Sequence, residues 1–388
     1  MPHNSKDNLQ STNPNFFHEM IEEKRGSTVT DNEKQPKLSL SKKSGIYPNE
    51  QTLHGVNLGN WLLLEKWMSP GLYSSPDQKD EYTLCEALGD KAKGIMRAHR
   101  ESWITEADFK WLANWGINAV RLPFGYWILE ADGPYVDSID IMDQAVDWCE
   151  QYGMKLLLDL HGLPGCQGPE HHTGRGGHFQ WPKDANCYAR SLDLIEQFAQ
   201  RYKDKSCING FSVVNEPHET IDAKVLIKFY EASIERVRKH MPAEKVAAVI
   251  AAYPENLMST YHGCVPHIEN VMTDVHLYQS FCGWENCDPF TYIYAASRRG
   301  EQLGKWAQQG SFVIGEWSLS WPKELHDVLK TWPTSMYDQL MRAYASTQLA
   351  AFEQANGWYF WSYKVIDRPH WSFRDAVERG WFPSKIDG

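Results

Sequence analysis

Short apolar runs alternate with amphipathic stretches along most of this chain. Runs rich in β-branched residues and leucine, bounded by Gly, Pro or Asn, are typical of buried strands. The predicted strands are His54–Gly59, Ile117–Pro123, Lys155–Gly162, Ile208–Pro217, Lys245–Ala252, Val271–Tyr278, Ser311–Trp317 and Gly357–Tyr363. Stretches between them carry apolar residues three and four positions apart, which is the spacing of one buried helix face. The clearest predicted helices are Thr105–Trp115, Ile139–Tyr152, Ala189–Tyr202, Ala223–Met241 and Met336–Gln354.

Regular alternation of strand and helix predicts parallel strands joined by crossover helices, and eight such units close into a barrel. We therefore predict an α/β fold, a single (β/α)8 TIM barrel with loop insertions, over residues 46–388. Residues 1–45 are rich in Ser, Asn, Lys, Glu and Asp and show no periodicity, so we expect a polar N-terminal tail or arm.

Chemically useful side chains stand at six of the eight predicted strand ends. They are Arg121, Asp159, His161, Asn215, Glu216, His276, Tyr278, Glu316 and Trp361. One polar residue after a strand is common, because helix N-caps favour Asp, Asn and Ser. Active sites of (β/α)8 enzymes lie at the carboxyl ends of the strands. The repeated pattern therefore predicts one site that these side chains share.

Glu216 and Glu316 each follow an apolar strand run. Taken alone, either glutamate could equally be a catalytic residue or a solvated loop residue. Hydrolysis of a glycosidic bond needs one carboxylic acid to protonate the leaving oxygen and a second carboxylate at the anomeric carbon. Two glutamates on the fourth and seventh strands of one barrel favour that catalytic pair.

The neighbouring residues fit the same chemistry. Asn215 can donate to a sugar 2-hydroxyl, and Tyr278 can donate a hydrogen bond to the nucleophile. His276 lies two positions before Tyr278 and faces the same side of the strand, as a core histidine also would. We expect Arg121 to pair with Glu316, either to keep it ionised or as a buried structural salt bridge.

Composition and charge narrow the function. The chain holds 17 Trp, 18 Tyr and 15 Phe, and aromatic rings suit the C–H faces of sugars, although core packing accounts for most of them. The net charge of −11 would repel phosphate backbones, so we expect no nucleic-acid partner. Nothing in the sequence indicates an oligomeric state.

The sequence carries no run of about 18 apolar residues, so we expect no membrane span. Residues 1–17 lack the apolar core of a signal peptide, which favours a cytoplasmic protein, with secretion possible if a leader was removed. The eight cysteines form no metal-type pair, so we expect no metal or cofactor and free thiols, with Cys282–Cys287 as the alternative bridge.

Several ordered segments resemble glycoside hydrolase family 5, and within it the exo-β-1,3-glucanase branch. They are GVNLGNWLLLEKWMSPGLY (55–73), DEYTLCEALGDKAKGIMRAHRESWITEADF (80–109), GINAVRLPFGYW (116–127), LLLDLHGLPG (156–165), VVNEP (213–217), HLYQSF (276–281), VIGEWS (313–318), GWYFWSYK (357–364), WSF (371–373) and WFP (381–383). The resemblance covers about residues 52 to 385.

This resemblance implies that Glu216 is the acid/base and Glu316 the nucleophile of a retaining enzyme. It implies a set of side chains around the sugar at the cleavage subsite: Arg121, His161, Asn215, His276, Tyr278 and Trp361. Glu65 would bind the hydroxyls of the terminal glucose in a pocket that releases single glucose units. The substrate would then be a β-glucoside or β-glucan.

The loop after the third strand departs from the family pattern. Glu170 stands where the exo-glucanases carry one aromatic residue of an entrance clamp, while Phe281 keeps the other half. His171, His172 and His178 with Cys166 fit no standard zinc spacing, so we expect a loop that contacts substrate through hydrogen bonds.

Alternative functions share the two carboxylates. They are a diglycosidase of flavonoid glycosides, a glucosylceramidase-like enzyme, an endoglucanase and a transglycosylase, with an inactive carbohydrate-binding protein as the non-enzymatic alternative. The hydrolases would differ in the loops around residues 165–185 and 282–310.

Overall fold

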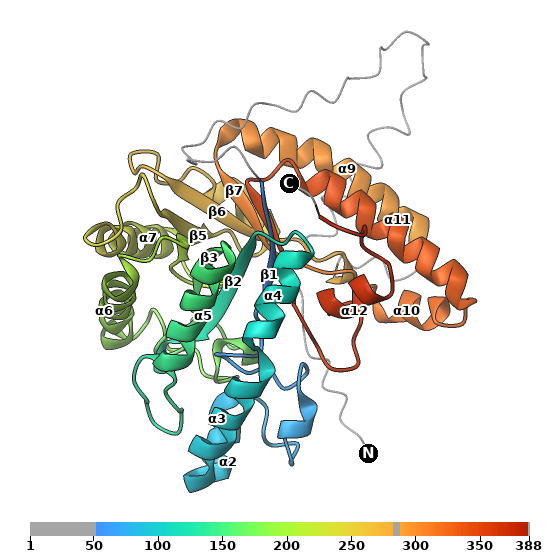
Figure 1. Ribbon diagram of the computed structural model, residues 1–388. Coiled ribbons are helices and arrows are strands. Elements are labelled where there is room, and N and C mark those ends of the chain that lie inside the picture. The colour runs from blue at the N-terminus through green and yellow to red at the C-terminus, as the bar shows by residue number, and fades with distance from the viewer. Residues whose placement is uncertain (1–51, 282–287, 387–388) are drawn as a thin grey trace.

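Eight parallel strands close into a barrel in the computed structural model, which describes residues 52–281 and 288–386 (Figure 1). The strands are β1 (Leu53–Asn57), β2 (Ala119–Gly125), β3 (Lys155–Gly162), β4 (Ile208–Ser212), β5 (Ala247–Ala251), β6 (Val271–His276), β7 (Phe312–Trp317) and β8 (Gly357–Phe360). Each strand pairs with the next in sequence, and β8 pairs with β1. The predicted (β/α)8 TIM barrel is therefore confirmed.

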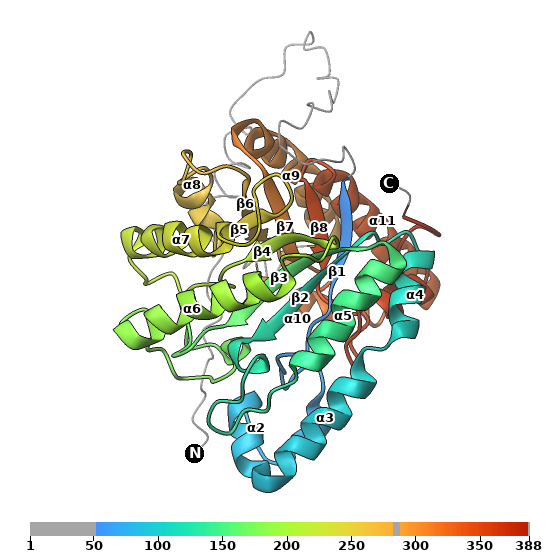
Figure 2. The ribbon, with the colours of Figure 1, turned by 60° about the vertical axis from the view of Figure 1, so that its left-hand side comes forward.

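Helices surround this barrel. The described helices are α2 (Glu81–Leu88), α3 (Ala92–Trp103), α4 (Glu106–Asn114), α5 (Ile139–Tyr152), α6 (Ala185–Tyr202), α7 (Ala223–Arg238), α8 (Met258–Tyr261), α9 (Pro289–Gln309), α10 (Lys323–Leu329), α11 (Thr334–Phe352) and α12 (Phe373–Glu378). Figure 2 shows α3 beside α5, where Arg97 bonds Asp140 across the two helices. None of the helices described is both long and apolar enough to cross a lipid bilayer.

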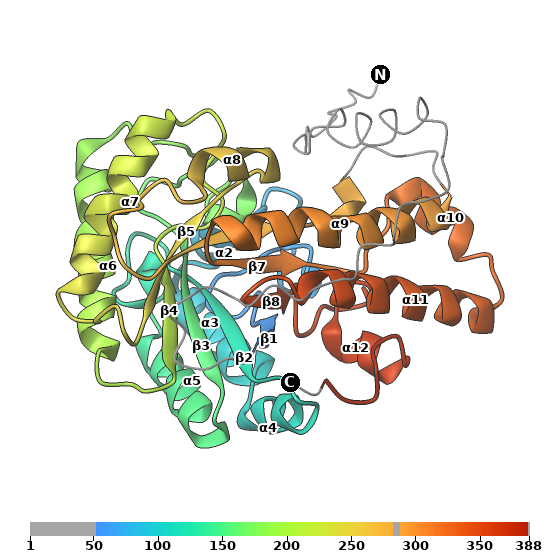
Figure 3. The ribbon, with the colours of Figure 1, turned by 90° about the horizontal axis from the view of Figure 1, so that it is seen from above.

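Helix α9 corrects the prediction of a loop over residues 282–310. Asp288 caps this helix by accepting hydrogen bonds from the backbone N–H groups of Phe290 and Thr291. Gly300 weakens the helical pattern in the sequence, but a Cβ there would lie 3.6 Å from Ala351 of α11, so the glycine permits close packing. Figure 3 shows α9 and α11 side by side. Residues 282–287 lie outside the described ranges.

Several strands end earlier than the pattern predicts. The strands β4, β6 and β8 stop at Ser212, His276 and Phe360. Residues beyond these points lie outside the regular strands, and Glu216 adopts a φ of 38°. Because a positive φ is costly for a residue with a side chain, the loop after β4 must hold Glu216 in place.

The barrel interior has an apolar floor. Its residues are Leu53, Ala119, Leu157, Ala247, Val249, Met272, Val313 and Tyr359. Side chains alternate along a strand, so a residue two positions beyond a floor residue also points inward. Arg121, Asp159 and Asp274 occupy such positions and form a buried charged layer above the floor. Gly315 leaves room for this layer, since a Cβ there would lie 2.0 Å from the Asp274 carboxylate.

Candidate active site

Arg121 lies at the centre of the site and is fully buried. Its NH1 group donates to Glu316 at 2.8 Å and to Asn57 at 3.0 Å, and NH2 donates to Asn215 at 2.7 Å. Asp159 forms a further ion pair with the guanidinium at 3.1 Å. The predicted pairing of Arg121 with Glu316 is confirmed. The geometry fits both interpretations of this pair, since Arg121 favours the ionised form of Glu316 and also acts as a structural salt bridge that joins four strands.

The charge of Arg121 is permanent. Burial alone would lower its pKa, but attraction to Asp159, Asp274 and Glu316 raises the pKa instead. A cation held among three buried acids places positive charge directly beneath Glu316.

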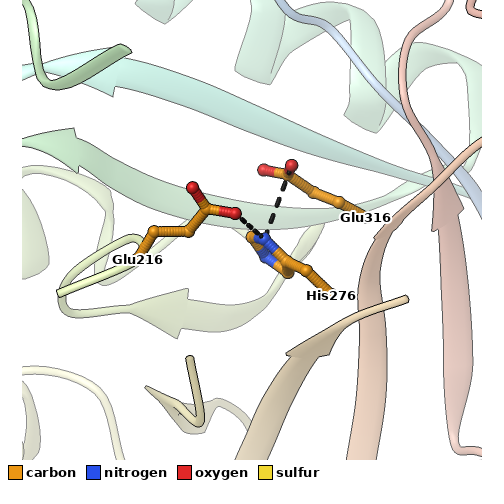
Figure 4. A group of neighbouring side chains, drawn as sticks. All are labelled: Glu216, His276 and Glu316. Atoms are coloured by element: carbon orange, nitrogen blue, oxygen red, sulfur yellow. Dashed lines mark hydrogen bonds and ion pairs between the residues drawn. The ribbon is translucent and has the colours of Figure 1, made fainter. Parts of the chain in front are cut away.

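Glu216 and Glu316 face each other across His276 (Figure 4). The Nδ1 atom of His276 lies 2.6 Å from Oε1 of Glu216 and 3.5 Å from Oε2 of Glu316. The three side chains bring oxygen and nitrogen atoms within 4.8 Å of one another. Retaining glycosidases separate their two carboxyl groups by about 5–5.5 Å and inverting enzymes by about 6.5–9.5 Å. One oxygen of each carboxyl group lies within 4.8 Å of the other, which is nearer to the retaining spacing than to the inverting one.

Both oxygens of Glu316 are held. Arg121 donates to Oε1, and the hydroxyl of Tyr278 donates to Oε2 at 2.7 Å. Burial raises the pKa of Glu316, while the charges of His276 and Arg121 oppose that rise. Burial and the charge of Glu316 raise the pKa of Tyr278 well above its ordinary value, so Tyr278 remains a donor.

Glu216 is an anion in these surroundings. Burial alone would raise its pKa, but attraction to His172 and the hydrogen bond with His276 lower the pKa to about 2. Burial disfavours the charged form of His276, but Glu316 and Asp274 raise the pKa of His276 well above its ordinary value. The proton that an acid would need at Glu216 therefore rests on a neighbouring histidine.

Glu65 is a further buried carboxylate, at the rim of the site. Its Oε2 atom accepts a hydrogen bond from Trp67 at 2.9 Å and lies 3.3 Å from Nε2 of His171. Burial would raise the pKa of Glu65, but the hydrogen bond and charge of His171 lower it. An ionised carboxylate of this kind can accept hydrogen bonds from sugar hydroxyls.

His161 and Trp361 form an adjoining wall. The rings stack at 5.7 Å between centroids. Nδ1 of His161 bonds Asp159 at 2.7 Å, and Nε2 lies 3.2 Å from the Asn215 amide nitrogen. Phe281 lies farther out, 42% exposed, with its ring 5.8 Å from that of Tyr278.

The structure thus brings all the predicted site residues into one connected set, while their individual roles remain predictions. Sequence reasoning missed two further members, Asp274 and Gln167, and named His172 only as part of a loop expected to contact substrate. Asp274 lies two positions before His276 on β6, so the inward alternation could have revealed it. Gln167 donates to the carbonyls of His161 and Asn215, and no sequence pattern predicts these two hydrogen bonds.

Glu216, His276 and Glu316 are also the described acid and histidine side chains close enough to share a metal ion. The guanidinium of Arg121, 2.8 Å from Glu316, opposes a second cation there. The described cysteines, Cys85, Cys149, Cys166, Cys187, Cys207 and Cys264, are free thiols. Cys282 and Cys287 lie outside the described ranges, so their pairing stays untested.

Comparison with known proteins adds a family match. The family model described as Cellulase (glycosyl hydrolase family 5) matches residues 86–364. The chain is 30% identical to probable glucan 1,3-beta-glucosidase A of Aspergillus clavatus, over 90% of this chain and 91% of that protein. It is 32% identical to glucan 1,3-beta-glucosidase 1 of Schizosaccharomyces pombe, over 87% and 89% of the two chains.

Solved structures share the fold at lower identity. The rutinosidase from Aspergillus niger has a TM-score of 0.71 and 20% identity, with 85% of this chain and 97% of that chain covered. The structure titled AoRut has a TM-score of 0.70 and 23% identity, with 85% and 96% covered. These similarities concern the barrel alone.

Proposed function

The chain belongs to glycoside hydrolase family 5 and is a glycosidase, and we propose that it is a retaining, exo-acting β-glucosidase that releases glucose from β-1,3-glucan or related β-glucosides. The observation that carries this proposal is the pair of buried carboxylates, Glu216 and Glu316, with side-chain atoms within 4.8 Å across His276. Relatives named as glucan 1,3-beta-glucosidases, covered over most of their length, support the linkage.

The proposed reaction has two steps. Glu316 attacks the anomeric carbon while Glu216 gives its proton to the leaving oxygen, which forms a covalent glycosyl-enzyme. Water then attacks the same carbon, loses a proton to Glu216 and frees Glu316. Arg121 and Tyr278 occupy both oxygens of Glu316 and so fix the direction from which it attacks.

The exo action follows from Glu65 in this proposal. A buried carboxylate in the segment after β1, held by Trp67 and His171, would accept hydrogen bonds from the hydroxyls of a terminal sugar. An internal sugar of a chain has its 3-hydroxyl engaged in a glycosidic bond and would satisfy this carboxylate less well.

Hydrolysis of laminarin tests the proposal. We expect glucose as the sole early product, and a ladder of oligosaccharides would refute exo action. The variant Glu316→Ala should lose hydrolysis of aryl β-glucosides and form a glycosyl azide when azide is added. Glu219→Ala, which removes an exposed carboxylate from the loop after β4, serves as the matched control. A 2-fluoro glucoside should label Glu316, and labelling of another residue would overturn the assignment.

A second candidate keeps the chemistry but changes the leaving group. Glu170, on the loop after β3, lies 3.9 Å from His218, so this part of the entrance is polar. Phe281 instead packs near Trp371, 6.2 Å between ring centroids, and Trp371 packs edge-on against Trp67 at 5.3 Å. One aromatic wall suits a flat or apolar aglycone. Higher kcat/KM for aryl or flavonoid glucosides than for laminaribiose would favour this β-glycosidase.

A further inference from the structure

Two consecutive histidines after β3 contact two different carboxylates of the site. Nε2 of His171 lies 3.3 Å from Oε2 of Glu65. Nε2 of His172 lies 3.3 Å from Oε2 of Glu216. One short segment therefore reaches both the rim carboxylate and the proposed acid/base.

This segment is held firmly. Residues His171–Thr173 form a 3-10 turn, and the Thr173 hydroxyl donates to the Glu170 carbonyl at 2.8 Å. Gly174 has a φ of 97°, and a Cβ there would lie 2.2 Å from the Trp127 ring. The position of His172 is thus set by the loop backbone and its packing.

His172 is mostly enclosed, with a side chain 15% exposed. Within the described residues its Nε2 atom has no hydrogen-bond partner. The titratable groups that face it are Glu216, Glu65, His171 and His161, whose ring centroid lies 5.8 Å away. Burial lowers the pKa of His172, and the charge of Glu216 opposes that decrease. Burial and the Glu216 carboxylate therefore act on the imidazolium in opposite directions, and burial is the larger effect.

Glu216 needs a proton before it can act as an acid, and two histidines could supply it. His276 keeps its proton because Asp274, 3.6 Å away, and Glu316, 3.5 Å away, stabilise its charge. His172 has no such second acid within the ion-pair distances of the described structure. It is also the more exposed of the two side chains, 15% against 5%.

We propose that His172 shares a proton with Glu216 and thereby sets the upper pH at which Glu216 can act as an acid. The proton passes from Nε2 of His172 to Oε2 of Glu216, which leaves a neutral imidazole and a carboxylic acid. Glu216 then transfers this proton to the leaving oxygen. His172 acts through Glu216 and is a positioning residue, and the inference rests on the acid/base role proposed for Glu216.

The pairing has a defined effect on pH dependence. The ion pair retains its last proton to a higher pH than either group would alone, because each charge stabilises the other. Without His172, the acid form of Glu216 is lost at the pKa of the carboxyl alone. The basic limb of kcat/KM, normalised to its maximum, should therefore move to lower pH in a variant that lacks the imidazole.

The variant His172→Gln tests this, since glutamine keeps a polar side chain beside the Glu216 carboxylate but does not titrate. For a glucoside with a poor leaving group, we expect the basic limb to move down by about one pH unit or more. For 2,4-dinitrophenyl β-glucoside, which needs no acid, the limb should stay in place. His178→Gln is the matched control, because no hydrogen bond or ion pair of the described residues joins His178 to Glu65 or Glu216. An unmoved limb, or equal loss on both substrates, would overturn the proposal.

A measurement without turnover separates this inference from the proposed function. In protein labelled with [13C]histidine, the signal that disappears in His172→Gln identifies His172. Its pKa should fall in Glu216→Gln, since the neutral amide no longer stabilises the imidazolium. An unchanged pKa would refute proton sharing even if the protein hydrolyses β-glucosides. A fall in pKa in a protein that hydrolyses no β-glycoside would refute the enzymatic function and leave the coupling intact.

Discussion

Replacing Arg121 by Met removes the cation that balances three buried acids. Arg121 has no exposed surface and pairs with Glu316 at 2.8 Å, Asp159 at 3.1 Å and Asp274 at 3.5 Å. Removing one partner of a buried ion pair typically costs about 3–5 kcal/mol, because the remaining charge stays buried. With a urea m-value of about 3 kcal/mol/M, the unfolding midpoint should fall by about 1–1.7 M at pH 7.5.

The loss should shrink as the pH falls. In the wild-type chain, burial would raise the pKa of Asp159, but Arg121 lowers it, so the ionised form adds stability above the ordinary pKa of the carboxyl. In Arg121→Met, His161 and His276 still lower that pKa, but the larger contribution of Arg121 is lost, so the pKa rises and the ionised form adds less stability at neutral pH. The difference between the two midpoints is therefore largest at neutral pH and smaller near pH 5.

Urea denaturation followed by tryptophan fluorescence at pH 7.5, 6 and 5 measures this difference. Arg97→Met is the matched control, since Arg97 is 43% exposed where it pairs with Glu101 and Asp140. Such an exposed pair contributes about 1 kcal/mol or less. Equal midpoints for the two arginine variants, or a gap that widens on acidification, would show that the buried charged layer is not held by Arg121.

Three further substitutions test contacts at the site and the packing of α9. Tyr278→Phe removes the hydroxyl that donates to Glu316 at 2.7 Å, and loss of a hydrogen bond to a charged group, about 1.5–3 kcal/mol, should lower kcat/KM by about 10- to 150-fold in steady-state assays. Unchanged kcat/KM would refute the role of the hydroxyl. Gly315→Ala places a Cβ 2.0 Å from the Asp274 carboxylate, so we expect lower thermal stability and activity. Gly304→Ala on α9, where the nearest atom is 3.7 Å away, should instead raise the melting temperature slightly.

The sequence predicts the barrel because strand and helix patterns are local. The predicted bounds of Lys155–Gly162 and Ile139–Tyr152 coincide with β3 and α5. It also predicts which side chains meet, since the carboxyl ends of parallel strands share one edge and Arg121 and Glu316 both lie there. Helix α9 was not predicted, because Gly300, which allows close packing on α11, weakens the helical pattern of apolar residues.

Sequence patterns do not predict the contacts that loops make. His172 reaches Glu216 only because a turn with a left-handed glycine directs the segment back over the site, and no periodicity encodes such a turn. Asp274 differs, because it follows the inward alternation of β6 and could have been found from position alone. Backbone strain at Glu216, with its φ of 38°, is likewise invisible in the residue order.

The apolar floor of the barrel leaves a bound sugar with one way out. Met272 and Val313 pack with the other floor residues below the charged layer and close the barrel interior. A glucose bound near Glu65 therefore cannot leave through the far end of the barrel. Product must retreat along the path by which the next glucan chain arrives, and glucose therefore competes with substrate as it accumulates. Turnover would then slow as glucose accumulates. This product inhibition would follow from the closed end of the barrel and would need no separate regulatory site.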